Sequence, residues 1–209
     1  HMGLLPGDAD DRIMNGANDN ASGTASMIEV ANALVAAPPR RSVLFIAWFG
    51  EELGLFGSRH YVSKPLEPLA KTIANVNLEQ MGRIDDPAGP AHGSAGMTGA
   101  DYSSVGDIFA RAAEEMGVRF VRNPQWDEYF ARSDNVSFAA RGIPAHTMSV
   151  ALEFPDYHKV SDEWHKLDYA NMEKITRFVA EGVARLANSE QAPEWNANNP
   201  NAAAFAGAR

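Results

Sequence analysis

Five side chains that could bind a metal ion or move a proton stand near the ends of predicted elements. They are Asp19, Glu51, Glu52, Glu79 and His158. Asp19 lies in the loop before the first predicted helix, and the other four follow predicted strands directly or closely. Because the functional loops of an open α/β sheet gather beyond the carboxyl ends of its strands, we expect these side chains to meet at one rim of the sheet.

Carboxylates gathered in one cleft repel one another, and some of them would take up protons at neutral pH unless a cation were bound. Asp, Glu and His are suitable ligands for zinc, and a carboxylate between two ions can bridge them. The adjacent pair Glu51-Glu52 allows one carboxylate to bind metal while its neighbour takes a proton from water. Two structural alternatives stay open: the Glu pair as charge at a helix N-terminus and Asp19 as a helix cap.

The hydrophobic pattern predicts strands that alternate with helices. Helices are expected at residues 22–37, 53–62, 102–116, 133–141 and 167–188, and strands at 43–49, 72–78, 118–121 and 143–152. The run at 43–49 does not alternate, which is typical of a strand buried on both faces, and the Gly- and Pro-rich residues 83–100 are expected to form a long excursion. This order predicts an α/β protein, a three-layer α/β/α sandwich with a mostly parallel central sheet.

Composition excludes several classes of protein. The 209 residues hold 18 Lys and Arg against 27 Asp and Glu, a formal net charge of -9, with no basic run, so we expect no nucleic-acid groove and no membrane-binding patch. The chain has no cysteine, which rules out disulfides and thiolate chemistry. Its longest apolar run is far too short to span a bilayer.

Five short segments carry a resemblance to a known family. In chain order they are Asn18-Asp19-Asn20-Ala21-Ser22-Gly23, Phe49-Gly50-Glu51-Glu52-Leu53-Gly54-Leu55-Phe56-Gly57-Ser58, Asn77-Leu78-Glu79, Arg132-Ser133-Asp134 with Gly142-Ile143-Pro144-Ala145, and Tyr157-His158. Together they resemble the di-zinc exopeptidases of metallopeptidase family twenty-eight, which include bacterial aminopeptidases and glutamate carboxypeptidases. The resemblance covers about residues 11–186 and implies a zinc peptidase catalytic domain at 1–188, followed by an Ala-, Asn- and Pro-rich tail at 189–209.

The resemblance implies two zinc ions. Asp19 would bridge them, and Glu52 with His158 would complete the first site. Glu79, at a position where many relatives have Asp, would bind the second ion.

For the reaction, the resemblance implies metal-activated water with Glu51 as general base, and Tyr157 is similar to a tyrosine that stabilises the oxyanion in some members. The implied function is a zinc-dependent exopeptidase acting on terminal peptide bonds of a peptide substrate, an aminopeptidase in preference to a carboxypeptidase. Two alternatives stay open: a glutaminyl-cyclase-like enzyme with one zinc, and a non-catalytic peptidase-fold binding module, against which the retained Glu51 argues.

One part of the family pattern is absent. Relatives carry an upstream His-x-Asp segment whose His serves the second zinc, and His1-Met2-Gly3 fits only its later part, unless His1 is a tag residue. We therefore expect the family's N-terminal segment to be missing, the second zinc to be weakly held by Asp19 and Glu79, and this chain to be inactive if that site is disabled. A sheet edge left unpaired predicts a homo-oligomer. The resemblance also implies a secreted or periplasmic protein.

Other candidate residues receive structural interpretations. The histidines elsewhere in the chain, His60, His92, His146 and His165, are expected to be surface or core residues. Asp134 is expected to cap the helix at 133–141, with support of a metal ligand as the other interpretation. Trp126 and Tyr129 are equally consistent with lining a substrate pocket and with packing their own loop.

Overall fold

A four-stranded sheet lies at the centre of the fold. The computed structural model describes residues 3–207, and the sheet has the strand order β3 (Asn75–Leu78), β6 (Ala145–Ser149), β4 (Ser94–Met97) and β5 (Arg119–Val121). The pairs β3–β6 and β4–β5 are parallel, whereas β4 and β6 are antiparallel. The sheet is therefore mixed and mostly parallel, as the sequence predicted.

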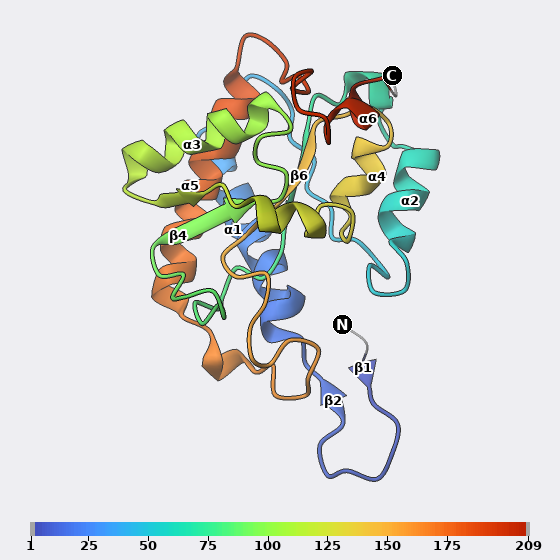
Figure 1. Ribbon diagram of the computed structural model, residues 1–209, viewed down its shortest axis with the longest axis vertical. Coiled ribbons are helices and arrows are strands. Elements are labelled where there is room, and N and C mark those ends of the chain that lie inside the picture. The colour runs from blue at the N-terminus through green and yellow to red at the C-terminus, as the bar shows by residue number, and fades with distance from the viewer. Residues whose placement is uncertain (1–2, 208–209) are drawn as a thin grey trace.

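Helices cover both faces of this sheet (Figure 1). Their bounds are α1 (Gly23–Ala36), α2 (Phe56–Ser63), α3 (Ser104–Met116), α4 (Asn135–Ala139), α5 (Tyr169–Asn188) and α6 (Ala203–Ala206), with short helical turns at Ala17–Ser22, Leu69–Lys71, Pro124–Tyr129 and Trp164–Lys166. A small antiparallel hairpin of β1 (Gly3–Leu4) and β2 (Ile13–Met14) precedes them. Among the described helices, none is both long and apolar enough to cross a membrane.

Two hydrophobic cores, one on each face of the sheet, hold the three layers together. The larger core joins α1, α3 and α5 to the sheet and includes Phe109, Met148 and Phe178. The smaller core joins α2 and α4 to the other face and includes Phe138 and Ala145. Because side chains alternate along a strand, β6 supplies Met148 to one core and Ala145 to the other. The predicted three-layer α/β/α sandwich is confirmed.

The prediction of a strand at 43–49, buried on both faces, is wrong. In the described structure this segment belongs to no sheet, and Leu44 and Phe49 are 54% and 73% exposed. Val43 still packs against the larger core and Trp48 against the smaller one. The segment is therefore apolar because it borders both cores, although no described strand pairs with it.

The sequence also missed a strand. The predicted excursion at 83–100 contains β4 (Ser94–Met97), which lies between β6 and β5 in the sheet. Its residues Ser-Ala-Gly-Met include no β-branched or large aromatic side chain, so the usual strand signal is absent. Small residues are needed there because the ring of Trp126 lies over Gly96, where an added Cβ would come within 2.4 Å of it.

The last residues of the chain pack onto the fold. Trp195 forms an isolated β-bridge with Ser103, and its indole N–H donates to the carbonyl of Gly142 at 3.0 Å. Ala202 is fully buried in the smaller core. The segment predicted as a tail at 189–209 thus covers one end of that core over its described part.

Candidate functional site

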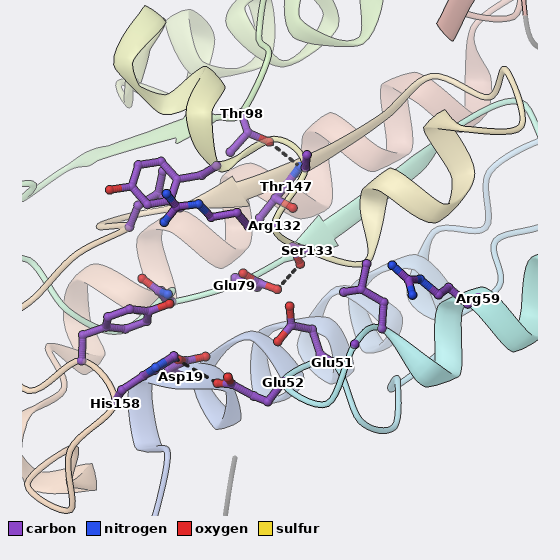
Figure 2. Close-up of a pocket in the computed structure, with 17 residues that line it drawn as sticks. Asp19, Glu51, Glu52, Arg59, Glu79, Thr98, Arg132, Ser133, Thr147 and His158 are labelled. Atoms are coloured by element: carbon purple, nitrogen blue, oxygen red, sulfur yellow. Dashed lines mark hydrogen bonds and ion pairs between the residues drawn. The ribbon is translucent and has the colours of Figure 1, made fainter. Parts of the chain in front are cut away.

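Three of the predicted metal ligands meet in one group. The Nε2 atom of His158 lies 3.2 Å from Oδ2 of Asp19 and 3.1 Å from Oε1 of Glu52, and one potential ligand atom of each residue lies within 4.8 Å of the others. Two carboxylate oxygens and an imidazole nitrogen form a donor set that zinc prefers. The residues therefore fit the metal, and they come from three separate segments of the chain (Figure 2).

This group lines a cavity of about 410 Å³. Glu51 and Glu79 line the same cavity, as does Tyr157, and Figure 2 shows the carboxylates of Glu51 and Glu79 close to each other, whereas the Glu52 carboxylate points toward His158. All six residues singled out in the sequence as ligands or catalytic groups are thus brought together. The described part of the chain groups only three of them at metal-binding distance, and Glu79 is not among these.

The Asp19 segment is fastened to the end of β3. The Asn20 side chain donates to the carbonyl of Leu78 at 2.8 Å and accepts from the N–H of Gly23 at 3.1 Å. The hydroxyl of Ser22 accepts from the N–H of Met81 at 2.9 Å. These bonds explain why short polar residues and a glycine surround the aspartate.

A tight turn presents the two adjacent glutamates. Gly50 has a φ of +68°, a conformation that glycine adopts without steric cost. The N–H of Gly57 donates to the carbonyl of Phe49 at 2.7 Å and closes the turn. An added Cβ at Gly57 would come within 2.7 Å of the Phe49 nitrogen. Gly50 and Gly57 therefore allow the tight turn from which the side chains of Glu51 and Glu52 reach the cavity.

Polar neighbours hold the carboxylate of Glu79. The Ser133 hydroxyl donates to it, and the Asn77 amide donates to Glu79 at 3.2 Å and to Ser133 at 2.7 Å. Burial nevertheless raises the pKa of Glu79 to about 7, because it outweighs the effect of the Ser133 hydrogen bond. Without a cation, Glu79 is therefore partly protonated at neutral pH.

Glu51 is the most strongly perturbed carboxyl of the site. Burial, followed by the negative charges of Glu79 and Glu52, raises the pKa of Glu51 to about 8. The nearby Asp134, itself buried, acts in the same direction. A carboxyl group with a pKa near neutrality is suited to accept and return a proton.

Tyr157 stacks on the imidazole of His158 with ring centroids 3.9 Å apart. Burial, followed by the charges of Asp19 and Glu52, raises the pKa of Tyr157 above its usual value. Its hydroxyl therefore stays protonated at neutral pH and can donate a hydrogen bond in the cavity.

The four histidines interpreted as structural do not line the cavity. His146 is fully buried, with its ring nitrogens bonded to Ser103 and the Thr98 carbonyl. His92, His60 and His165 are exposed. The prediction for these histidines is confirmed, while His1 lies outside the described residues.

Asp134 occupies the N-cap position of α4, but its side chain makes no capping hydrogen bond to the helix. The predicted side-chain cap is therefore wrong.

Trp126 and Tyr129, which the sequence left open between lining a pocket and packing their own loop, differ in the structure. Trp126 is buried against Gly96, whereas Tyr129 lines the cavity and donates to Glu153 at 2.5 Å.

Sequence reasoning gave no role to several residues of the site. Arg59 and Arg132 line the cavity and add positive charge at its edges. Asn77 and Ser133 hold Glu79, as described above. An available signal was the pair of asparagines in this strand, Asn75 and Asn77, because a buried amide needs hydrogen-bond partners.

The chain is similar in sequence and in fold to known peptidases. The model of the family described as peptidase family M28 matches residues 1–183. Aminopeptidase YwaD of Bacillus subtilis is 30% identical over 186 residues, covering 86% of this chain and 39% of that protein. A probable glutamate carboxypeptidase VP8 of Zea mays is 28% identical over 183 residues, covering 79% of this chain and 25% of that protein.

A solved structure of a zinc aminopeptidase from Bacillus subtilis shares the fold, with a TM-score of 0.71 and 27% identity over 85% of this chain and 44% of the other. The chain thus spans less than half the length of the relatives named here. A family match over most of its residues, together with this shared fold, identifies the chain as a member of peptidase family M28.

Proposed function

We propose that this chain carries the catalytic site of a zinc-dependent exopeptidase, and specifically of an aminopeptidase. The observation that supports it best is the meeting of Asp19, Glu52 and His158 at metal-binding distance, beside two further carboxyl groups in one cavity. Asp19, Glu52 and His158 would hold one zinc ion. Asp19 would share a second, weaker ion with Glu79.

Bound zinc would supply a Lewis acid that polarises the scissile carbonyl and lowers the pKa of water. Glu51 would take a proton from the attacking water and deliver it to the nitrogen of the leaving amine as the C–N bond breaks. Tyr157 would donate its hydroxyl to the carbonyl oxygen as negative charge develops there. The raised pKa of Tyr157 supports this role, because the phenol keeps its proton.

The charge of the cavity supports cleavage at the amino end of a peptide. Carboxyl groups of Asp19, Glu51, Glu52 and Glu79 line the cavity and would attract a substrate's terminal ammonium group. A carboxypeptidase would instead need a cation for the substrate's carboxylate, and the two arginines that line the cavity, Arg59 and Arg132, are outnumbered there by the four carboxyl groups.

The test combines zinc analysis with hydrolysis of leucine p-nitroanilide by the 209-residue chain. We expect at least one zinc ion per chain after dialysis against metal-free buffer. Glu51→Gln should lower kcat by about 10²–10⁴-fold, as loss of a general base does, while zinc stays bound. Glu67→Gln, which changes an exposed glutamate outside the cavity, is the matched control. It should leave kcat and the zinc content unchanged.

Hydrolysis that persists in Glu51→Gln would contradict the assigned base. Zinc binding without any hydrolysis by the parent chain would favour a binding module. Equal hydrolysis of an N-acetylated substrate would contradict the preference for a free amino end.

We also propose that a second copy of this chain covers the exposed apolar segment at 42–49. Leu44 and Phe49 are 54% and 73% exposed there, and β3 is an outer strand of the described sheet. Outer strands and apolar segments of this kind are common sites of self-association.

A further inference from the structure

A buried aspartate outside the proposed ligand set contacts the backbone of Asp19. Asp162 is 2% exposed, and both its carboxylate oxygens accept from the N–H of Asn18 at 3.0 Å. Its Oδ2 also accepts from the N–H of Asp19 at 3.0 Å. The carboxylate therefore holds two successive peptide groups, one of which belongs to the central residue of the site.

The main chain of Asp162 adds to this contact. Its carbonyl accepts from the N–H of Ala17 at 3.2 Å, and its own N–H donates to the carbonyl of Lys159 at 3.1 Å. Lys159 directly follows His158. Asp162 thus joins the turn that carries His158 to the segment that carries Asp19, through both its side chain and its backbone.

Hydrogen bonds between a buried carboxylate and backbone N–H groups are short and stronger than neutral ones. The residues that follow Asp19 are fastened to the end of β3, through Asn20 to Leu78 and through Ser22 to Met81. Asp162 adds bonds to the N–H groups of Asn18 and Asp19 themselves, so the segment is held both at Asp19 and directly after it. Such fixed geometry favours metal binding, because ligands that are already in place lose less freedom when the ion binds.

We propose that Asp162 is a positioning residue that fixes the backbone of Asp19 next to His158 and so sets the affinity of the site for zinc. This role rests on the proposed zinc site. Asp162 would contact neither the ion nor the substrate. It acts only through the peptide groups of Asn18 and Asp19.

The test compares zinc affinity, by competition with a chromophoric chelator, in the 209-residue chain and its Asp162→Asn variant. Asparagine keeps the shape but replaces one acceptor oxygen with an NH₂ group that faces a backbone N–H. We expect the dissociation constant for zinc to rise about 10-fold, as for other residues that support metal ligands. Amide hydrogen exchange over residues 14–22 should become faster in the metal-free variant.

Asp168→Asn is the matched control. Asp168 also accepts a backbone N–H, that of Asn171 at 2.9 Å, but at the start of α5. The Asp168→Asn variant should leave the zinc affinity and the amide hydrogen exchange over residues 14–22 unchanged. Melting temperatures of the metal-free proteins, with affinities measured well below them, separate a general loss of stability from a change at the site.

Asp162→Glu keeps the charge and is the second variant, for use if Asp162→Asn does not fold; the same weakening of zinc is expected. Parent-like zinc affinity in the folded variant, or equal weakening in Asp168→Asn, would overturn the role. Failure of both Asp162 variants to fold would also overturn it, because Asp162 would then serve the whole fold. A parent chain that binds no zinc would overturn the proposed function itself, and this role with it.

Discussion

Glu51 links the protonation of the site to the stability of the metal-free protein. In the unfolded chain its carboxyl loses its proton near the ordinary value of 4.5, whereas in the folded chain burial and neighbouring carboxylates hold the proton until about pH 8. Between these values the folded state binds more protons than the unfolded state. Stability must therefore fall as the pH rises through this range.

We predict that the melting temperature of the metal-free chain falls by several degrees between pH 5 and pH 8 through the contribution of Glu51. Glu79, with a pKa raised to about 7 by burial, acts in the same direction. Glu51→Gln removes the first contribution, so its melting temperature should fall less over the same range. Calorimetry of both proteins with a chelator present measures the two pH dependences of the melting temperature. Subtracting one from the other removes the contributions of the titratable groups that both proteins contain.

Saturating zinc should reverse this trend, because deprotonated carboxylates bind the metal and binding to the folded state raises stability. Identical pH dependence in the parent and in Glu51→Gln would contradict the raised pKa of Glu51. Zinc that stabilises the chain equally at pH 5 and pH 8 would contradict binding through these carboxylates.

At the scale of elements, the start of α1 sets the position of the Asp19 segment. Gly23 begins this helix, and an added Cβ there would come within 2.3 Å of both the Asn20 side chain and the Leu78 carbonyl. Neither group is free to move, because the Nδ2 atom of the same Asn20 amide donates to the Leu78 carbonyl at 2.8 Å.

We predict that Gly23→Ala destabilises the chain by about 1–3 kcal/mol, the usual cost of overpacking, and also weakens zinc binding. The helix must shift away from β3 or the Asn20 bond must break, and either change moves Asp19. Urea unfolding and zinc titration measure the two effects. Gly207→Ala, at a site with nothing within 4 Å, is the control. Normal zinc affinity in a destabilised Gly23→Ala would show that Asp19 does not depend on this contact.

The sequence was sufficient to predict that the site residues meet, and all of them line one cavity. Glu79 directly follows a strand, as expected, whereas Glu51 and Glu52 follow a segment that is no strand in the described structure and reach the cavity from the turn before α2. It was less informative about the sheet. The apolar residues of 43–49 predicted a strand, but burial against two cores and pairing in a sheet leave the same signal. Conversely, β4 (Ser94–Met97) was missed because close packing of Trp126 requires small residues there.

The links between site residues were also beyond the sequence. Asp162 and Ser133 contact Asn18 and Glu79, respectively, from segments that are far apart along the chain. A single polar residue near a motif does not indicate which backbone group it will meet. Such contacts depend on how the elements pack, which only the three-dimensional structure describes.

At the scale of the whole molecule, large apolar side chains are exposed on α1 and on the segment that follows it. Val35 on α1 is 79% exposed, and Leu44 and Phe49 on the following segment are 54% and 73% exposed. Residues of α1 are apolar on nearly every side, with Glu29 its one charged residue. A helix that is apolar all round is normally buried. These features support the proposed contact with a second copy of the chain.

We predict that the chain forms a dimer or larger homo-oligomer, and that Leu44→Glu shifts it toward the monomer. A charge placed in an apolar interface loses its water without gaining a partner, and in a symmetric dimer the change appears in both copies. Size-exclusion chromatography with light scattering measures the mass over a range of protein concentrations. Leu66→Glu, at an 80% exposed leucine outside this segment, is the control. A strictly monomeric parent would contradict self-association, and a shift caused equally by Leu66→Glu would mean that added negative charge, rather than the segment at 42–49, decides the assembly.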